Sequence, residues 1–195
     1  MSTSEEGRSY HHGDLRAALL RAALELLAER GEAGISLREV ARRAEVSHNA
    51  PYRHFADREA LLAALAEQGF SELLVRMQDA AGGLAAAQRL AALGRCYVAY
   101  ALEQRGLFRL MFASALERGR YPQLQESAAR LHGQLELAVA ALKVPDTAIA
   151  SLSAWSLVHG LSQLLLDGQV PGGENPEALI EQVTRTFAEG LGGRG

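Results

Sequence analysis

Ser47, His48 and Asn49 stand directly before Ala50 and Pro51, and their side chains suit hydrogen bonding to the edges of DNA bases. Asparagine can form a pair of hydrogen bonds with adenine, and histidine can donate to or accept from a base edge. The methyl group of Ala50 can contact the methyl group of thymine. These residue types therefore predict a segment that reads bases.

A first short helix is expected before this segment. Ser36-Leu37-Arg38-Glu39 matches a capping box, in which the serine hydroxyl accepts a hydrogen bond from the amide of residue 39 and the Glu39 carboxylate reaches back to the amide of Ser36. The pattern predicts a helix over residues 36–44, followed by a turn at Glu45-Val46.

A second short helix is expected over residues 47–54 to carry the base-reading side chains. Ser47 can cap it, and Pro51 is tolerated only in the first turn of a helix, so the helix cannot begin much before Ser47. Two helices of this length are unstable alone. Such a pair, joined by about three residues, is typical of a helix-turn-helix unit, whose second helix enters the major groove of DNA.

Basic residues surround this pair of helices, although the whole chain has a formal net charge of -3. The arginines of residues 36–58 outnumber the acidic residues of the same segment, and they are Arg38, Arg42, Arg43, Arg53 and Arg58. Arg38 and Arg58 are the stronger candidates for contacts with DNA phosphates, and a solvated surface charge is the alternative for each of the five. The overall acidity argues only weakly against nucleic acid, because a local basic patch overrides the average.

The rest of the chain predicts an all-α protein of one or two domains. It has 195 residues, of which 48% are hydrophobic and 6% aromatic, and alanine and leucine dominate without any alternating strand pattern. Cys96 is the single cysteine, which excludes an intramolecular disulfide. Nine helices are expected, near 15–30, 36–44, 47–54, 57–77, 84–104, 107–113, 123–143, 147–168 and 176–191.

Neither a membrane-spanning helix nor a signal peptide is expected. Polar residues are expected to interrupt every leucine-rich tract before it reaches the roughly 20 apolar residues of a bilayer span. Residues 1–10 are polar and lack the apolar run of a signal peptide. We therefore expect a cytoplasmic protein without a membrane partner.

The first 70 residues carry three short motifs. Residues 36–41 follow the pattern Ser/Thr-Leu-Arg-Glu-Val-Ala, residues 52–55 follow Tyr-x-His-Phe, and residues 57–62 read Asp-Arg-Glu-Ala-Leu-Leu. In these motifs the chain resembles the TetR family of bacterial repressors, with Arg58 where the family more often has lysine. The resemblance implies a helix-turn-helix repressor domain with a buried Phe55. Pro51 departs from the family, which mostly has an aliphatic residue there, and it is expected to shorten the recognition helix.

The resemblance also assigns roles to single residues in DNA binding. It implies phosphate contacts from Ser36, Tyr52, His54 and Arg58, and base contacts from the residues around His48 and Asn49. Together with the arguments from the side chains, the candidate DNA-binding residues are Ser36, Arg38, Ser47, His48, Asn49, Ala50, Tyr52, His54 and Arg58.

The second half resembles one subgroup of this family, which is named for a Trp-x-x-x-His-Gly signature. Residues 155–160 carry that signature, and residues 10–16 and 107–112 are also similar to the subgroup. The expected organisation is a flexible arm at 1–10, a DNA-binding domain at 11–71 and a regulatory and dimerisation domain at 84–192. His11 and His12 are expected either to lie next to DNA or to be solvated, since adjacent histidines lack the spacing of a metal site.

A cluster of aromatic and related side chains in the second half is the candidate site for a small apolar ligand. Its members are Tyr97, Tyr100, Phe108, Met111, Phe112, Trp155 and His159. Such a cluster is either hydrophobic core or the lining of a hollow between helices, and both interpretations stay open. For His159, which lies one helical turn after Trp155, a satisfied core histidine is favoured over a ligand contact.

The partners expected are a palindromic operator in double-stranded DNA, a small-molecule effector and a second copy of the chain. The last two long helices have more apolar residues than an internal core requires, namely Leu152, Leu157, Leu161, Leu164, Leu165, Leu179, Val183 and Phe187. By resemblance these helices pair with their copies in a four-helix bundle.

The predicted function is that of a DNA-binding repressor released by its ligand. We expect no cofactor, no metal site and no catalytic site, because no nucleophile and base or carboxylate pair has a recognisable spacing. A helical dimerisation protein without ligand sensing and an all-α enzyme are the alternatives.

Overall fold

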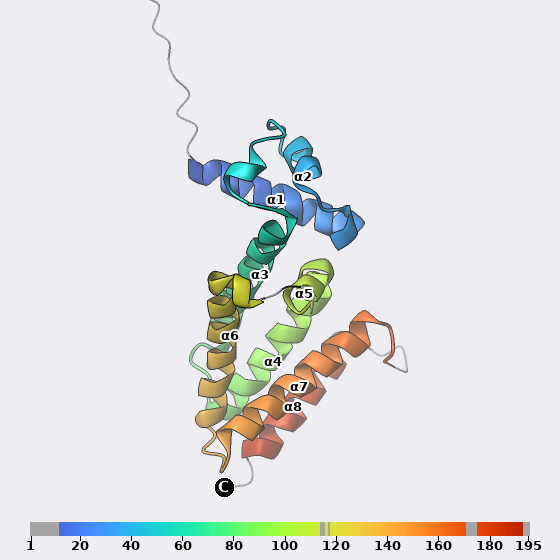
Figure 1. The fold of residues 1–195 in the computed structure, drawn as a ribbon. Coiled ribbons are helices and arrows are strands. Elements are labelled where there is room, and N and C mark those ends of the chain that lie inside the picture. The colour runs from blue at the N-terminus through green and yellow to red at the C-terminus, as the bar shows by residue number, and fades with distance from the viewer. Residues whose placement is uncertain (1–11, 114–115, 117, 171–174, 193–195) are drawn as a thin grey trace, which may run out of the picture. The chain divides into compact units, whose positions relative to one another are not determined.

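The computed structural model describes residues 12–113, 116, 118–170 and 175–192. All secondary structure in these residues is helical, which confirms the predicted all-α class. The α-helices are α1 (His12–Arg30), α2 (Leu37–Arg43), α3 (Arg58–Ala81), α4 (Ala86–Glu103), α5 (Arg105–Met111), α6 (Pro122–Ala140), α7 (Thr147–Leu166) and α8 (Pro176–Gly192) (Figure 1). Short 3₁₀ turns are η1 (Glu32–Gly34), η2 (Pro51–Arg53) and η3 (Arg118–Arg120).

The chain divides into two compact units, residues 1–65 and 66–195. The division falls inside α3, earlier than the domain limits of 71 and 84 expected from the sequence. The C-terminal part of α3 belongs to the second unit because the Tyr100 hydroxyl donates to the Gly69 carbonyl at 3.3 Å and Arg76 pairs with Glu103. The expected arm at residues 1–10 and His11 lie outside the described residues.

The first unit is held together by a small apolar core and by arginine-carboxylate pairs. Leu19, Leu26 and Phe55 are buried in it. On its surface Arg43 of α2 donates to Glu25 and Glu29 of α1. The hydrogen bond from Arg43 lowers the pKa of Glu29 below its ordinary value.

The cap that begins α2 forms as the sequence predicts, but only in part. The Oγ of Ser36 accepts a hydrogen bond from the amide of Glu39 at 3.1 Å. The Glu39 carboxylate does not reach back to Ser36, because it accepts charge-assisted hydrogen bonds from Arg42 and Arg30 instead. The hydrogen bond from Arg42 is the main cause that lowers the pKa of Glu39 to about 2. The contribution of this pair to folding is therefore present above the ordinary glutamate pKa and is lost as the pH falls toward 2.

The turn after α2 places a non-glycine residue in the left-handed region. Glu45 has a φ of 55°, the Val46 amide donates to the Ala41 carbonyl at 3.0 Å, and the Glu45 amide donates to the Arg42 carbonyl at 3.3 Å. This pair of hydrogen bonds is the Schellman motif that ends a helix. The turn predicted at Glu45-Val46 is thereby confirmed.

The α-helix predicted over residues 47–54 is not formed. In its place the chain makes a turn and then η2. The hydrogen bonds here join residues three apart, as in a 3₁₀ helix: the Ala50 amide donates to the Ser47 carbonyl (2.9 Å), and the Arg53 amide donates to the Ala50 carbonyl (3.2 Å). Proline has no amide hydrogen, and its ring clashes with the carbonyl four residues earlier, so Pro51 cannot continue a helix from Ser47. The predicted cap by the Ser47 side chain is therefore not formed, and the N-cap residue of η2 is Ala50, which makes no side-chain capping hydrogen bond.

Helix α4 is the centre of the second unit, where it contacts α6, α7 and α8. Val98, Leu161 and Ile180 form a buried cluster, against which Leu165 and Val183 pack. The approach of α4 to α8 depends on Gly94, because a Cβ at this position would lie 2.9 Å from the Thr184 methyl carbon. Figure 1 shows α7 and α8 side by side next to α4.

Helix α7 corrects the expectation that polar residues interrupt every apolar tract. Thr147–Leu166 contains no Asp, Glu, Lys or Arg, and by length and composition alone it is the one described helix that could cross a membrane. Within the second unit it packs on α4, α6 and α8, and a core helix of a bundle passes the same test. Only 28% of the tested stretch is buried, so much of its apolar surface is uncovered in the single chain.

Two helical glycines are predicted to respond in opposite ways to alanine. A Cβ on Gly69 would lie 2.7 Å from the Met111 sulfur, so we expect Gly69→Ala to destabilise the protein by about 1–3 kcal/mol. A Cβ on Gly133 would have no heavy atom within 4 Å, so we expect Gly133→Ala to stabilise it by about 0.5–1 kcal/mol. Urea unfolding followed by circular dichroism measures both. Equal effects of the two substitutions would contradict the close approach of α3 and α5 at Gly69.

Candidate nucleic-acid interface and ligand cavity

The segment after the turn presents three of its four predicted base-reading residues to solvent. Ser47, His48 and Asn49 are exposed. Ala50 is buried, as is Pro51, so the methyl group of Ala50 is covered by the first unit. The surface that can approach a base edge is therefore made of the hydroxyl, imidazole and amide of residues 47–49.

The arginines of this region differ in how far the protein itself uses them. Arg42 and Arg43 are paired with acidic residues. Arg58 donates to the carbonyl oxygens of Ile35 (2.9 Å) and Glu32 (2.7 Å), so its guanidinium holds the loop before α2. Arg38 is exposed and has no ion pair among the described residues. Arg53 is likewise exposed without an ion pair in the described part of the chain, so Arg38 and Arg53 are the arginines whose whole charge is available to a phosphate.

The residues assigned to phosphates by resemblance lie in three different settings. Ser36 is exposed, and because its oxygen accepts the capping hydrogen bond, its own hydrogen stays available for donation. Tyr52 is 57% exposed. His54 is half-buried, and its Nε2 is enclosed without a hydrogen-bond partner in the described part of the chain. Nε2 of His54 is therefore not accessible to a phosphate.

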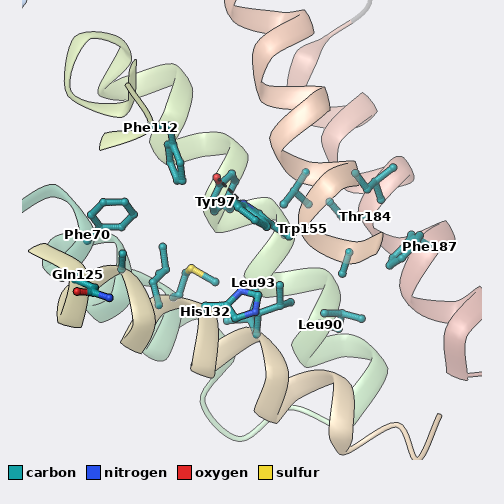
Figure 2. A pocket seen from close by; sticks show the side chains of 18 of the residues that line it. Phe70, Leu90, Leu93, Tyr97, Phe112, Gln125, His132, Trp155, Thr184 and Phe187 are labelled. Carbon is teal, nitrogen blue, oxygen red and sulfur yellow. Dashed lines mark hydrogen bonds between the residues drawn. The ribbon is translucent and has the colours of Figure 1, made fainter. Parts of the chain in front are cut away.

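A cavity of about 460 Å³ lies within the second unit. Its wall comes from the C-terminal part of α3 and from α4, α6, α7 and α8, with Phe112 after α5. The size is that of an ordinary small-molecule pocket. Figure 2 shows the aromatic rings of Phe70, Phe112, Tyr97 and Trp155 around one part of it and the side chains of Gln125 and His132 along α6.

The predicted ligand-binding cluster divides into two layers. Tyr97, Phe112 and Trp155 line the cavity. The others are not among its lining residues, and they are Tyr100, Phe108, Met111 and His159. Tyr100, Phe108 and Met111 are fully buried core residues. The ring of His159 is half-buried and lies 5.6 Å from that of Phe108.

A hydrogen-bonded trio connects the two layers. The Tyr97 hydroxyl lies 2.9 Å from Nδ1 of His159 and accepts a longer hydrogen bond from Nε1 of Trp155 at 3.4 Å. Burial raises the pKa of Tyr97 and lowers that of His159, so burial favours the neutral form of both groups, and the tautomer of His159 sets which of the two donates. His159 thus has the satisfied partner that the core interpretation requires. The one-turn spacing of Trp155 and His159 also brings their rings to 6.0 Å, as the sequence predicts.

Several cavity residues were not predicted from the sequence. They include Phe70, Met77, Leu90, Gln125, Leu131 and His132. The apolar periodicity of their helices was visible, but it marks a buried face without distinguishing a face that meets a side chain from one that meets a void. The helices that meet here are far apart in the chain, so no local spacing signals the cavity.

The comparisons with known proteins agree with this architecture. Residues 19–65 match the model described as bacterial regulatory proteins, tetR family, and residues 90–187 match the model described as tetracyclin repressor-like, C-terminal domain. The fold and these matches define a two-unit, all-helical transcriptional regulator. The chain belongs to the TetR family of bacterial regulatory proteins. The narrower resemblance at residues 155–160 lies inside the second match and stays a prediction.

Individual relatives add detail. A protein of unknown function from Rhodococcus is 35% identical, with a TM-score of 0.82 over 95% of this chain and 100% of that one. An HTH-type transcriptional repressor of Mycobacterium tuberculosis is 42% identical over 52 residues, which are 27% of this chain and only 28% of that protein. The transcriptional regulator FadR of Bacillus subtilis, solved in complex with stearoyl-CoA, has a TM-score of 0.72 at 18% identity over 89% and 98% of the two chains. The last similarity shows the fold alone.

Proposed function

We propose that this regulator is a sequence-specific repressor that binds a palindromic operator. The observation that carries the proposal is the exposed row Ser47, His48 and Asn49, held by η2 directly after the capped helix α2 and its Schellman turn. The matched repressor of Mycobacterium tuberculosis supports repression rather than activation, although the match covers about a quarter of that protein. Its place of action is then the cytoplasm, where the DNA is.

We further propose that a small molecule in the cavity weakens operator binding. The cavity supports this, and so does FadR, a regulator of the same fold that was solved in complex with stearoyl-CoA. Helix α3 begins with Arg58 in the first unit and contributes Phe70 and Met77 to the cavity wall in the second. One continuous helix is therefore available to transmit a change at the wall. A coupling of about 1–3 kcal/mol would change operator affinity roughly 5- to 150-fold.

The third part of the proposal is a twofold dimer built on the outer face of α7. Ile149, Leu152 and Leu164 are 61%, 52% and 45% exposed, and Ser156 and Gly160 lie between them along the helix. Small residues between apolar ones allow another helix to approach closely. Of the eight residues predicted for this interface, only Leu152 and Leu164 have exposed side chains. Four others pack inside the unit, namely Leu161, Leu165, Leu179 and Val183. The remaining two, Leu157 and Phe187, line the cavity.

Replacing Asn49 by alanine is expected to weaken binding to the true operator by about 1–3 kcal/mol and to relax one base position. The amide of an exposed asparagine can pair with adenine, and we expect its loss to leave the fold of the first unit unchanged because the side chain of Asn49 is exposed. The operator is selected first from random duplexes, and fluorescence anisotropy then measures the affinity of each variant for the selected and the scrambled sequence.

Arg38→Ala is the matched variant for phosphate contact. It is expected to weaken all sequences alike and to lower the slope of log affinity against log salt by about 1. Arg58→Ala is a poorer choice, because it would also remove the hydrogen bonds to Ile35 and Glu32. If the wild-type protein prefers no sequence over bulk DNA at moderate salt, the proposal of sequence-specific operator binding is refuted. A helical dimerisation protein is then the better interpretation.

A further inference from the structure

We propose that the cavity binds an uncharged lipophilic molecule with one hydrogen-bonding head group, and that it discriminates against carboxylates and acyl-CoA thioesters. This inference rests on the proposed function for its regulatory meaning, but not for the binding itself. The described lining residues include no Asp, Glu, Lys or Arg. Burying an unpaired charge against such a wall is costly, whereas burying a hydrocarbon body is favourable.

The polar atoms within the wall are already used by the protein. The Tyr97 hydroxyl is shared between His159 and Trp155. The Thr184 hydroxyl donates to the Ile180 carbonyl of its own helix at 2.7 Å. A ligand placed between the aromatic rings therefore meets a surface that offers it carbon and no free strong donor. This part of the cavity selects the apolar body of the ligand.

The groups that can bind a polar head lie together on α6. Gln125 and His132 both line the cavity, both are exposed to solvent, and their separation of seven residues places them on one side of the helix (Figure 2). The Gln125 amide can donate and accept, and it has no hydrogen-bond partner within the described residues. A hydroxyl or a neutral amide can satisfy both functions of this group.

Gln125 and His132 form the polar rim of the cavity, and the charges near this rim do not favour the binding of an anion. Nε2 of His132 lies 3.3 Å from the Glu136 carboxylate, which would repel a second carboxylate. Arg130 is paired with Glu126. Arg120 follows the lining residue Gly119, but its guanidinium lies over the Tyr121 ring at 5.9 Å and is not part of the lining. As far as the structure describes its side chains, the rim therefore offers an amide and an imidazole rather than a free cation.

The single tryptophan makes the test direct, because Trp155 is the only one in the chain and it lines the cavity. Its emission is followed while the full-length protein is titrated at pH 8 with decanol, decanamide, decanoate and decanoyl-CoA, and with phenylbutanol and phenylbutyrate. We expect each neutral member to bind at least about tenfold more tightly than its carboxylate, and decanoyl-CoA to bind no better than decanoate. Equal or tighter binding of the anions, or no binding of any neutral probe, overturns the proposal.

Three variants locate the head group and the body. Gln125→Arg places a cation at the rim and is expected to raise decanoate affinity while lowering that of decanol. Gln123→Arg is the matched control, since it adds the same charge at an exposed position on the same helix outside the lining. Ala154→Phe fills the cavity beside Trp155 and is expected to abolish binding of all probes. An inverted preference in the Gln123 variant would place the head group elsewhere and overturn the assignment to Gln125.

The same titrations separate this proposal from the proposed function. If decanol binds but leaves operator affinity unchanged, ligand-controlled release is refuted, whereas the selectivity for an uncharged ligand is supported. If decanoate binds more tightly than decanol and releases the operator, the selectivity for an uncharged ligand is refuted, whereas ligand-controlled release is supported.

Discussion

A protein in which Leu164 is replaced by glutamate is expected to be monomeric and to bind its operator at least about a hundredfold more weakly than the wild type. Leu164 is 45% exposed in the single chain, so a charge there costs the fold of the monomer little. In the proposed dimer the same side chain is buried against the second copy of α7, where an unpaired carboxylate is costly. Loss of the dimer removes the second half-site contact and with it most of the affinity.

Leu137→Glu is the control for this variant. Leu137 is 70% exposed on α6, so the substitution adds the same charge to a leucine that is more accessible than Leu164 and lies outside α7. Sedimentation velocity measures the oligomeric state, and anisotropy on the selected operator measures the affinity. The interface lies elsewhere if the Leu164 variant and a Leu152→Glu variant both remain dimeric, and it lies on α6 if Leu137→Glu alone dissociates the protein.

Replacing Phe55 by alanine is expected to destabilise the first unit by about 3–5 kcal/mol. Phe55 is 3% exposed, and the Arg16 guanidinium lies 5.7 Å from its ring centre. Its removal leaves a cavity in a core built from few elements, and a small unit has little stability to spare. We therefore expect the first unit of this variant to be largely unfolded at 37 °C and operator binding to be lost.

Tyr52→Ala is the matched control, because it removes a comparable ring that is 57% exposed, and its effect on stability is expected within about 0.5 kcal/mol. Urea unfolding is followed by circular dichroism for the whole chain and by Trp155 fluorescence for the second unit. The Phe55 variant should lose helicity at low urea while the tryptophan transition stays in place. A loss of less than 1 kcal/mol would contradict the packing of Phe55, and a shifted tryptophan transition would show that the two units unfold together.

Much of the fold follows from local patterns that the sequence determines by itself. The side chain of Ser36 caps α2 as predicted, the side chain of Asp57 caps α3, and the turn at Glu45 closes as a Schellman motif. These features depend on residues within one or two helical turns, so a local pattern contains their cause. The same holds for the all-helical class, since alanine and leucine periodicity favours helices wherever they later pack.

The recognition segment shows where local reasoning was incomplete. Pro51 restricts where a helix can begin, but the segment forms 3₁₀ structure rather than the predicted short α-helix. The same segment placed Ala50 inward and left residues 47–49 outward. Which side of a short turn is covered depends on the elements packed against it, and no periodicity exists in so few residues.

The functional assignments that only the tertiary structure decided are those that join distant segments. Arg58 is used by carbonyls of Ile35 and Glu32, more than twenty residues earlier, so its charge is shared with the fold. Tyr97 faces the cavity whereas Tyr100, three residues later, is fully buried against the Gly69 carbonyl. An apolar pattern states only that a face is buried. Whether that face meets a side chain, a void or a second copy of the chain depends on the crossing of helices, which local sequence does not encode.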